Sequence, residues 1–154
     1  MKKLILFFVL VFVTSGVYAQ EQGTIRGQGG LVYGVDTELG INLGVQYFVI
    51  DQIAIAPSYS FFFKDFIGLK YSSINIEGRY YFNEAIYGLA GIDIVRVSGS
   101  IELGEFGSFD ASGSSTEFAV GAGYDLELSD DILINFQAKY AGQIVLGAGV
   151  VYEF

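Results

Sequence analysis

Residues 41–49 read INLGVQYFV, a stretch in which apolar side chains occupy every second position. The odd positions are all apolar: Ile41, Leu43, Val45, Tyr47 and Val49. The even positions begin with three polar or small residues: Asn42, Gly44 and Gln46. A period of two residues is typical of a β-strand with one apolar and one polar face, so this stretch predicts such a strand.

The same alternation returns in seven further segments of the chain. It is regular over residues 73–82, 117–128, 132–141 and 144–154, and less regular over residues 24–35, 53–63 and 86–98. Pro57 lacks an amide donor, which predicts a bulge or another irregularity in its segment. Asp93 and Arg96 stand on opposite faces, so either one lies near a rim or a bulge resets the register. Eight such segments with no helical pattern between them predict an all-β, antiparallel fold.

The connections between these segments differ in length at the two ends of the expected sheet. Three are short, over residues 50–52, 83–85 and 129–131. The other four vary, near residues 36–40, 64–70, 99–116 and 141–143. Short turns at one end and variable loops at the other are typical of outer-membrane barrels. The expected fold is therefore an eight-stranded antiparallel up-and-down transmembrane β-barrel.

The longest connection, residues 99–116, permits two interpretations. Its Gly and Ser residues favour a mobile, solvated loop. Its partial alternation instead suggests that the two flanking strands continue beyond the membrane. In that case they would expose a sheet edge that could pair with a partner strand.

The first nineteen residues have the layout of a cleavable signal peptide. Lys2 and Lys3 precede an unbroken apolar run over residues 4–13, and small residues lie at positions −3 and −1 of a cut between Ala19 and Gln20. The alternative is an N-terminal membrane anchor, although the apolar run is short for one. The sequence therefore predicts a signal peptide over residues 1–19 and a barrel domain over residues 20–154.

Composition excludes several kinds of chemistry. The 154 residues are 52% apolar, yet after residue 19 no apolar run approaches the roughly 20 residues of a membrane helix. The absence of His and Cys removes imidazole bases, thiol nucleophiles and the metal ligands of both types. A net charge of −9 argues against nucleic acid as a partner. We therefore expect neither enzymatic activity nor a cofactor or metal.

Large aromatic residues gather near both ends of the apolar face. Near the short turns they are Tyr47, Tyr80, Phe82, Tyr152 and Phe154. Near the other end they are Tyr33, Phe61, Phe63, Tyr71, Phe118 and Tyr140. Two aromatic girdles around an aliphatic band match the two interfaces of a membrane, although aromatic residues in the core of a soluble barrel are the alternative.

The polar face carries charges that would line the lumen. An eight-stranded barrel is just wide enough for its own side chains, so buried charges there must pair. The sequence predicts an interior charge network of seven residues: Arg26, Glu77, Arg79, Asp93, Glu117, Asp125 and Lys139. These pairs either hold the barrel shut or act as a gate for a narrow ion path.

The chain ends with VVYEF, in which Tyr152 and Phe154 resemble the C-terminal signal read by the outer-membrane barrel assembly machinery. Residues 23–154 resemble the small eight-stranded outer-membrane barrels of the OmpX and OmpA type. They look closest to the "porin family" or "outer membrane protein beta-barrel domain" sequences common in Bacteroidetes. This resemblance implies a location in the outer membrane of a Gram-negative cell and contact with its lipid and lipopolysaccharide. It also implies biogenesis by the assembly machinery. A closed barrel has no free edge and needs no partner strand, so we expect a monomer.

The function expected is that of a structural or surface-interaction barrel. Its polar lumen would be largely plugged, and it would display extracellular loops, above all residues 99–116. The alternative is a narrow porin-like channel for ions or small solutes. A lipid-modifying enzyme is disfavoured because the chain has no His to act as a general base.

Overall fold

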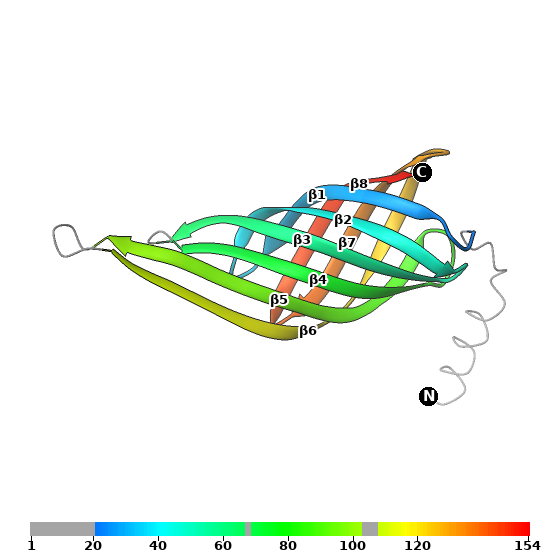
Figure 1. Cartoon of the computed structure of the whole chain (residues 1–154). Helices are drawn as coiled ribbons and strands as arrows, with labels where there is room; N and C mark the ends of the chain where they lie inside the picture. Colours follow the sequence, from blue (N-terminus) through cyan, green and yellow to red (C-terminus); the bar gives the residue numbers. More distant parts are fainter. Residues whose placement is uncertain (1–20, 67–68, 103–107) are drawn as a thin grey trace, which may run out of the picture.

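The computed structural model describes residues 21–66, 69–102 and 108–154, which form one closed barrel (Figure 1). Every strand pairs antiparallel with its neighbours in chain order, and β1 closes the barrel on β8. The strands are β1 (Ile25–Gly34), β2 (Glu38–Ile50), β3 (Ile53–Phe66), β4 (Leu69–Tyr81), β5 (Ile86–Glu102), β6 (Ser108–Ser129), β7 (Ile132–Ala141) and β8 (Gln143–Glu153). The predicted fold class is confirmed. The signal peptide and its cut between Ala19 and Gln20 lie outside the described residues.

The three short turns lie at one end of the barrel, together with the start of β1 and the end of β8. These turns join β2 to β3, β4 to β5 and β6 to β7. At the opposite end, residues 35–37 join β1 to β2, and Gly142 alone joins β7 to β8 with a positive φ of 68°. In the described part of the chain no helix is long and apolar enough to cross a membrane.

The expectation of a mobile loop over residues 99–116 is wrong for most of that segment. Strands β5 and β6 continue as a paired ribbon from Gly99↔Ala111 to Glu102↔Ser108, beyond the ends of the other strands (Figure 1). The partial alternation of this segment predicted that the two strands continue, and this second interpretation is confirmed. We call residues 96–102 and 108–116 the β5–β6 ribbon.

Two local expectations about strand register have different outcomes. The register is the same on both sides of Pro57, and only the pairing with β2 is interrupted between Gly44 and Tyr47. The bulge of this strand pair instead lies between Phe48 and Ile50. Along β5 the register is continuous, so Asp93 is buried and Arg96 is exposed toward the ribbon end.

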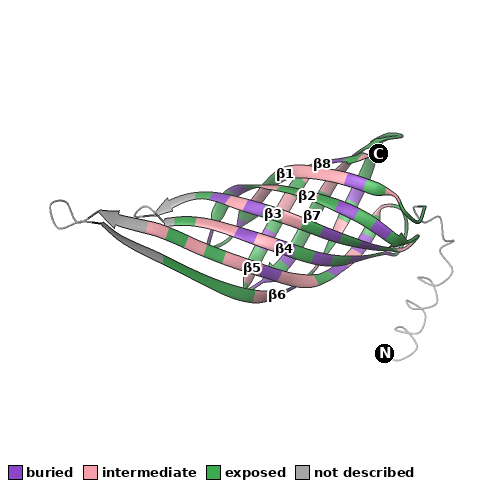
Figure 2. Cartoon of the chain, in the orientation of Figure 1, coloured by how far each residue is buried: buried purple, intermediate pink, exposed green. Residues whose placement is uncertain are grey.

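Burial alternates along much of the barrel wall, and it is inverted relative to a soluble protein (Figure 2). Leu43 and Val120 on the outside are 62% and 61% exposed, whereas Glu77 and Arg79 inside are 1% and 2% exposed. A soluble barrel would bury its aliphatic face, so the alternative of a soluble core is wrong. An apolar outer surface around a polar interior is the pattern of a barrel surrounded by hydrocarbon.

Aromatic rings are exposed on the outer surface near both ends, as expected. Phe63, Phe118 and Tyr140 lie near the ribbon end. Near the short turns, Tyr80 stacks edge-on against Phe82 at 5.3 Å, and Tyr152 packs likewise on Phe154 at 5.1 Å. Phe61 and Tyr71 are only half-exposed.

Candidate functional site: the charged lumen

Arg79 of β4 reaches across the middle of the lumen and joins four strands. Its Nη1 donates to Gln28 Oε1 of β1 at 2.9 Å and to Gln46 Oε1 of β2 at 3.3 Å. Its Nη2 donates to Glu77 Oε2 at 3.1 Å and to Gln137 Oε1 of β7 at 3.1 Å. A planar guanidinium with five donors in fixed directions suits such a crosslink. Arg79 therefore connects strands on different sides of the bore.

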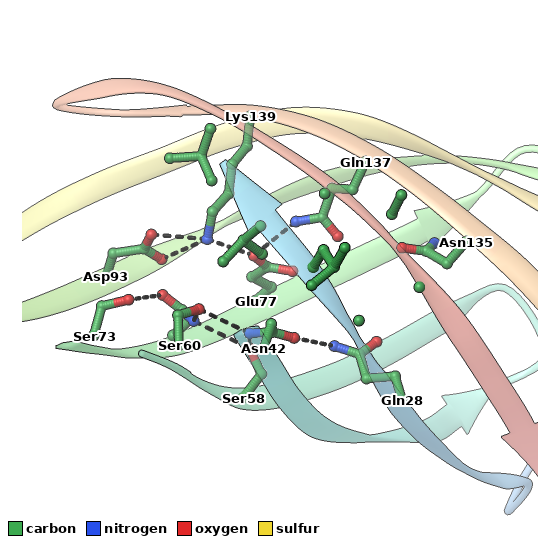
Figure 3. Close-up of a pocket in the computed structure, with 18 of the residues that line it drawn as sticks. Gln28, Asn42, Ser58, Ser60, Ser73, Glu77, Asp93, Asn135, Gln137 and Lys139 are labelled. Carbon is green, nitrogen blue, oxygen red and sulfur yellow. Dashed lines mark hydrogen bonds and ion pairs between the residues drawn. The ribbon is translucent and has the colours of Figure 1, made fainter. Parts of the chain in front are cut away.

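Lys139 of β7 forms a second crosslink closer to the ribbon end (Figure 3). Its Nζ lies 2.8 Å from Glu77 Oε1 and 2.7 Å from Asp93 Oδ2, and all three side chains are buried. The amide of Asn75 satisfies its neighbours when its nitrogen faces Asp93, at 3.1 Å. Glu77 is therefore shared by two cations, which compensates the cost of burying it.

Arg26 of β1 forms a third cluster at the short-turn end. Its Nε and Nη2 both lie 2.6 Å from Glu153 Oε2, and its Nη1 lies 3.7 Å from Asp125 Oδ2. The guanidinium carbon stands 5.0 Å from the centre of the Phe48 ring, a cation–π distance. This cluster ties both chain-terminal strands to β6 next to the seam where β1 meets β8.

Two buried tyrosines, which the sequence analysis did not single out, connect the Arg26 and Arg79 clusters. Tyr81 donates to Asp125 Oδ2 at 2.9 Å, and Tyr87 donates to Gln137 Oε1 at 3.1 Å. The Cζ of Arg79 lies 4.9 Å from the centre of the Tyr87 ring. Tyr87 fills the space opposite Gly123, where a Cβ would overlap its ring. Tyr81 occupies an odd-numbered position of β4, as Glu77 and Arg79 do, so the alternation of the sequence could have placed it on the inner face.

Six of the seven residues predicted for the network take part in it: Arg26, Glu77, Arg79, Asp93, Asp125 and Lys139. Glu117 does not join them. It pairs across the sheet with Asp93, which has the same charge, and its carboxyl group lies against Gly142 near the ribbon end. Within the described residues Glu117 forms no hydrogen bond or ion pair, and Glu153 takes the remaining place beside Arg26.

A chain of contacts runs along the bore from Arg26 to Lys139. In the described residues, two buried nitrogens have no hydrogen-bond partner, Nη1 of Arg26 and Nε of Arg79. Among the same residues no group of three or more acidic side chains could hold a metal ion. The chemistry of the site is therefore mutual neutralisation of charge in a narrow bore.

Comparisons with known proteins find matches among solved structures only. No family model matches the chain, and no curated protein matches it. The N-terminal β-barrel domain of Pseudomonas aeruginosa OprF superposes with a TM-score of 0.59 at 14% identity, covering 88% of this chain and 100% of that one. The attachment invasion locus protein Ail of Yersinia pestis, in complex with the heparin analogue sucrose octasulfate, gives 0.55 at 20% identity, covering 88% and 99%.

A de novo designed transmembrane β-barrel matches equally well, with a TM-score of 0.58, 13% identity, and coverage of 88% and 99%. The chain therefore has the fold of the small eight-stranded outer-membrane β-barrels, as its resemblance to the OmpX and OmpA type implied. Identities this low extend the likeness to the fold and no further. Tyr152 and Phe154 are exposed at the short-turn end, and their role as an assembly signal stays a prediction.

Proposed function

We propose that this chain is an outer-membrane protein with a sealed lumen, which presents the β5–β6 ribbon at the cell surface as an interaction edge. The observation that carries this proposal is the ribbon itself. Strand β7 ends its pairing with β6 at Ala119↔Ala141, so among the described residues β6 has no partner on that side from Ser108 to Phe118. A row of unpaired backbone groups is a template for strand addition by another protein.

The composition of this edge supports the proposal. Natural sheet edges are commonly protected by Lys, Pro or a bulge. Residues 112–118 read SGSSTEF, without Lys or Pro, and their pairing with β5 has no break in register. Ser112 to Thr116 are all exposed. The partner that fits is an extended chain segment, held by main-chain hydrogen bonds and selected by small polar side chains.

The location in the outer membrane is supported by the apolar outer band, the aromatic residues at both ends and the shared fold of outer-membrane barrels. Its surroundings would be lipid and lipopolysaccharide, and its biogenesis would use the barrel assembly machinery. A barrel closed by β1 and β8 needs no second copy to cover its edges, which supports a monomer in the membrane. A catalytic role is not part of the proposal.

Labelling of single cysteines in intact cells tests which end of the barrel faces outward. The chain has no Cys of its own, so each introduced thiol is the only one. With Ser114→Cys on the ribbon we expect modification by a membrane-impermeant maleimide in intact cells. With Asp130→Cys in the β6–β7 turn, the matched control, we expect modification only after the outer membrane is permeabilised. The reverse pattern, or protection of Ser114→Cys in both conditions, contradicts the proposal.

A channel is the second candidate function, because the bore is polar and two of its arginine nitrogens lack partners. Planar-bilayer recording of the refolded chain distinguishes the two, after a heat-dependent gel shift has verified folding. A sealed lumen predicts no steady conductance from the wild type, because Arg79 and Lys139 cross the bore. A channel predicts a steady conductance that changes in Arg79→Ala. Silence of both folded proteins rejects the channel.

A further inference from the structure

We propose that the lumen on the ribbon side of Arg79 is a binding site for one small, neutral, polyhydroxylated molecule of monosaccharide size. The bore there contains a cavity lined by Glu77, Arg79 and Asn135 in its inner part and by Thr37, Phe62 and Gln143 near the barrel mouth. This inference depends on the sealed base and is independent of the ribbon. The site would be blind, with one entrance.

One wall of the cavity is a cluster of hydroxyl and amide groups from three neighbouring strands (Figure 3). Asn42 of β2 donates to Ser58 Oγ at 3.1 Å and to Ser60 Oγ at 2.9 Å, both on β3. Asn75 of β4 lies 3.1 Å from Ser58 Oγ and 3.0 Å from Ser60 Oγ, and 2.9 Å from Ser73 Oγ. These groups hold each other in fixed positions, and each serine oxygen keeps a second lone pair for a ligand hydroxyl.

The part of the wall beside this cluster carries small and apolar residues. Gly30, Gly147 and Gly149 line it together with Val32 and Val145, along the seam between β1 and β8. At the mouth, Phe62 of β3 adds an aromatic ring that lines the cavity. A cavity that offers hydrogen-bonding groups and an adjoining apolar surface suits a sugar, which has hydroxyls at its rim and C–H groups on its faces.

The charges of the cavity cancel, which favours a neutral ligand. The charged side chains that line it are Glu77, Arg79, Asp93 and Lys139, two carboxylates and two cations. Each is paired within the network, Arg79 and Lys139 with Glu77 and Lys139 also with Asp93. A charged ligand would therefore enter a narrow site without a free counter-charge, at a desolvation cost.

The size of the cavity sets the size of the ligand. Its volume is about 60 Å³, whereas a single buried water needs roughly 10–15 Å³ by the same measure. The space thus corresponds to roughly four to six waters. A monosaccharide-sized molecule that displaces them would replace their hydrogen bonds by its own hydroxyl groups.

The test is a titration of the full folded chain in detergent micelles, followed by NMR of the side-chain amides of Asn42 and Asn75. The probes are D-glucose, its cationic analogue glucosamine and its anionic analogue glucuronate. We expect saturable shifts with glucose and binding of both charged analogues that is weaker by about tenfold or more. No shift with glucose, or a preference for either charged probe, overturns the proposal.

Gly147→Val is the informative variant, because it fills the cavity without straining the wall. A Cβ at Gly147 would lie 3.7 Å or more from its nearest neighbours, an ordinary contact. Gly78→Val is the matched control, since Gly78 is exposed outside the barrel and a Cβ there has comparable room at 3.6 Å. Binding of glucose should fall by about tenfold or more in the first and stay unchanged in the second.

A second variant keeps the test decisive if Gly147→Val does not fold. The double substitution Ser58→Ala and Ser60→Ala removes the two hydroxyl groups and adds no volume to the cavity. It should weaken glucose binding to a similar extent. Equal binding by the wild type and a folded variant of either kind would place the sugar elsewhere and reject the site. The bilayer and labelling results do not depend on this outcome.

Discussion

Glu77→Ala should lower the free energy of unfolding by about 3–5 kcal/mol, because it removes the carboxylate shared by two buried cations. Arg79 and Lys139 each lose an ion pair, at 3.1 Å and 2.8 Å respectively, while both side chains stay buried. The measurement is urea-induced unfolding of the refolded barrel in lipid vesicles, with the heat-dependent gel shift as a second readout. Glu127→Ala, an exposed carboxylate on β6, is the matched control and should change stability by less than about 0.5 kcal/mol.

A double substitution shows that the unpaired charge, rather than the lost volume, causes this effect. Adding Arg79→Met to Glu77→Ala removes the cation whose ion pair, among the described residues, was with Glu77, and it retains an unbranched apolar side chain. We expect the double variant to be more stable than Glu77→Ala alone, because the coupling of two contacting charges is not additive. A double variant that loses the full sum of both single effects would show that the ion pair is unimportant for stability.

Gly91→Ala should lower the free energy of unfolding by about 1–3 kcal/mol or more, because the new methyl group meets rigid backbone. A Cβ at Gly91 of β5 would overlap the carbonyl oxygen of Ile76 and come within 2.9 Å of the Cα of Glu77. Both atoms belong to β4, which is paired with β5 along its whole length inside the barrel. Relief would require the two strands to separate next to the charge network.

Gly78→Ala is the control for this substitution, because Gly78 lies on the same strand pair and faces outward. Its Cβ would lie 3.6 Å from the carbonyl oxygen of Ala90, which is an ordinary contact. The substitution should be neutral or stabilise the barrel by about 0.4–1 kcal/mol through the entropy of the unfolded chain. Urea unfolding of both variants under the same conditions measures the difference. Equal stability of the two would mean that strand curvature at Gly91 does not require glycine.

The strand pattern and the identity of the lumen charges could be predicted from the sequence. Period-two alternation depends only on the geometry of a pleated strand, so Glu77 and Arg79 had to share a face of β4. The narrow bore of eight strands then required their charges to pair. The assignment of Glu117 to the network was wrong. Alternation shows on which face of a strand a residue lies, but not how far along the barrel axis it lies.

Which side chains meet in the lumen, and how far along the barrel axis they lie, depends on the stagger between neighbouring strands. Lys139 meets Glu77 and Asp93 because β6 places Gly121 beside Lys139 and leaves Glu117 four residues farther along. The register change of the β2–β3 pair likewise lies at Phe48 rather than at Pro57. Alternation within one strand contains no information about the shift of its neighbour, so these contacts could not be read from the sequence.

The sequence by itself determined the number of strands, the face on which each side chain lies, and the inversion of apolar and polar surfaces. These follow from local backbone geometry and from the cost of placing charge in hydrocarbon. Only the tertiary structure decided which charges meet, that Tyr81 and Tyr87 link them, that β5 and β6 continue as a paired ribbon, and where the lumen leaves a cavity. Those features arise from the closure of the barrel, because closure fixes the shear between strands and so brings together side chains up to 127 residues apart.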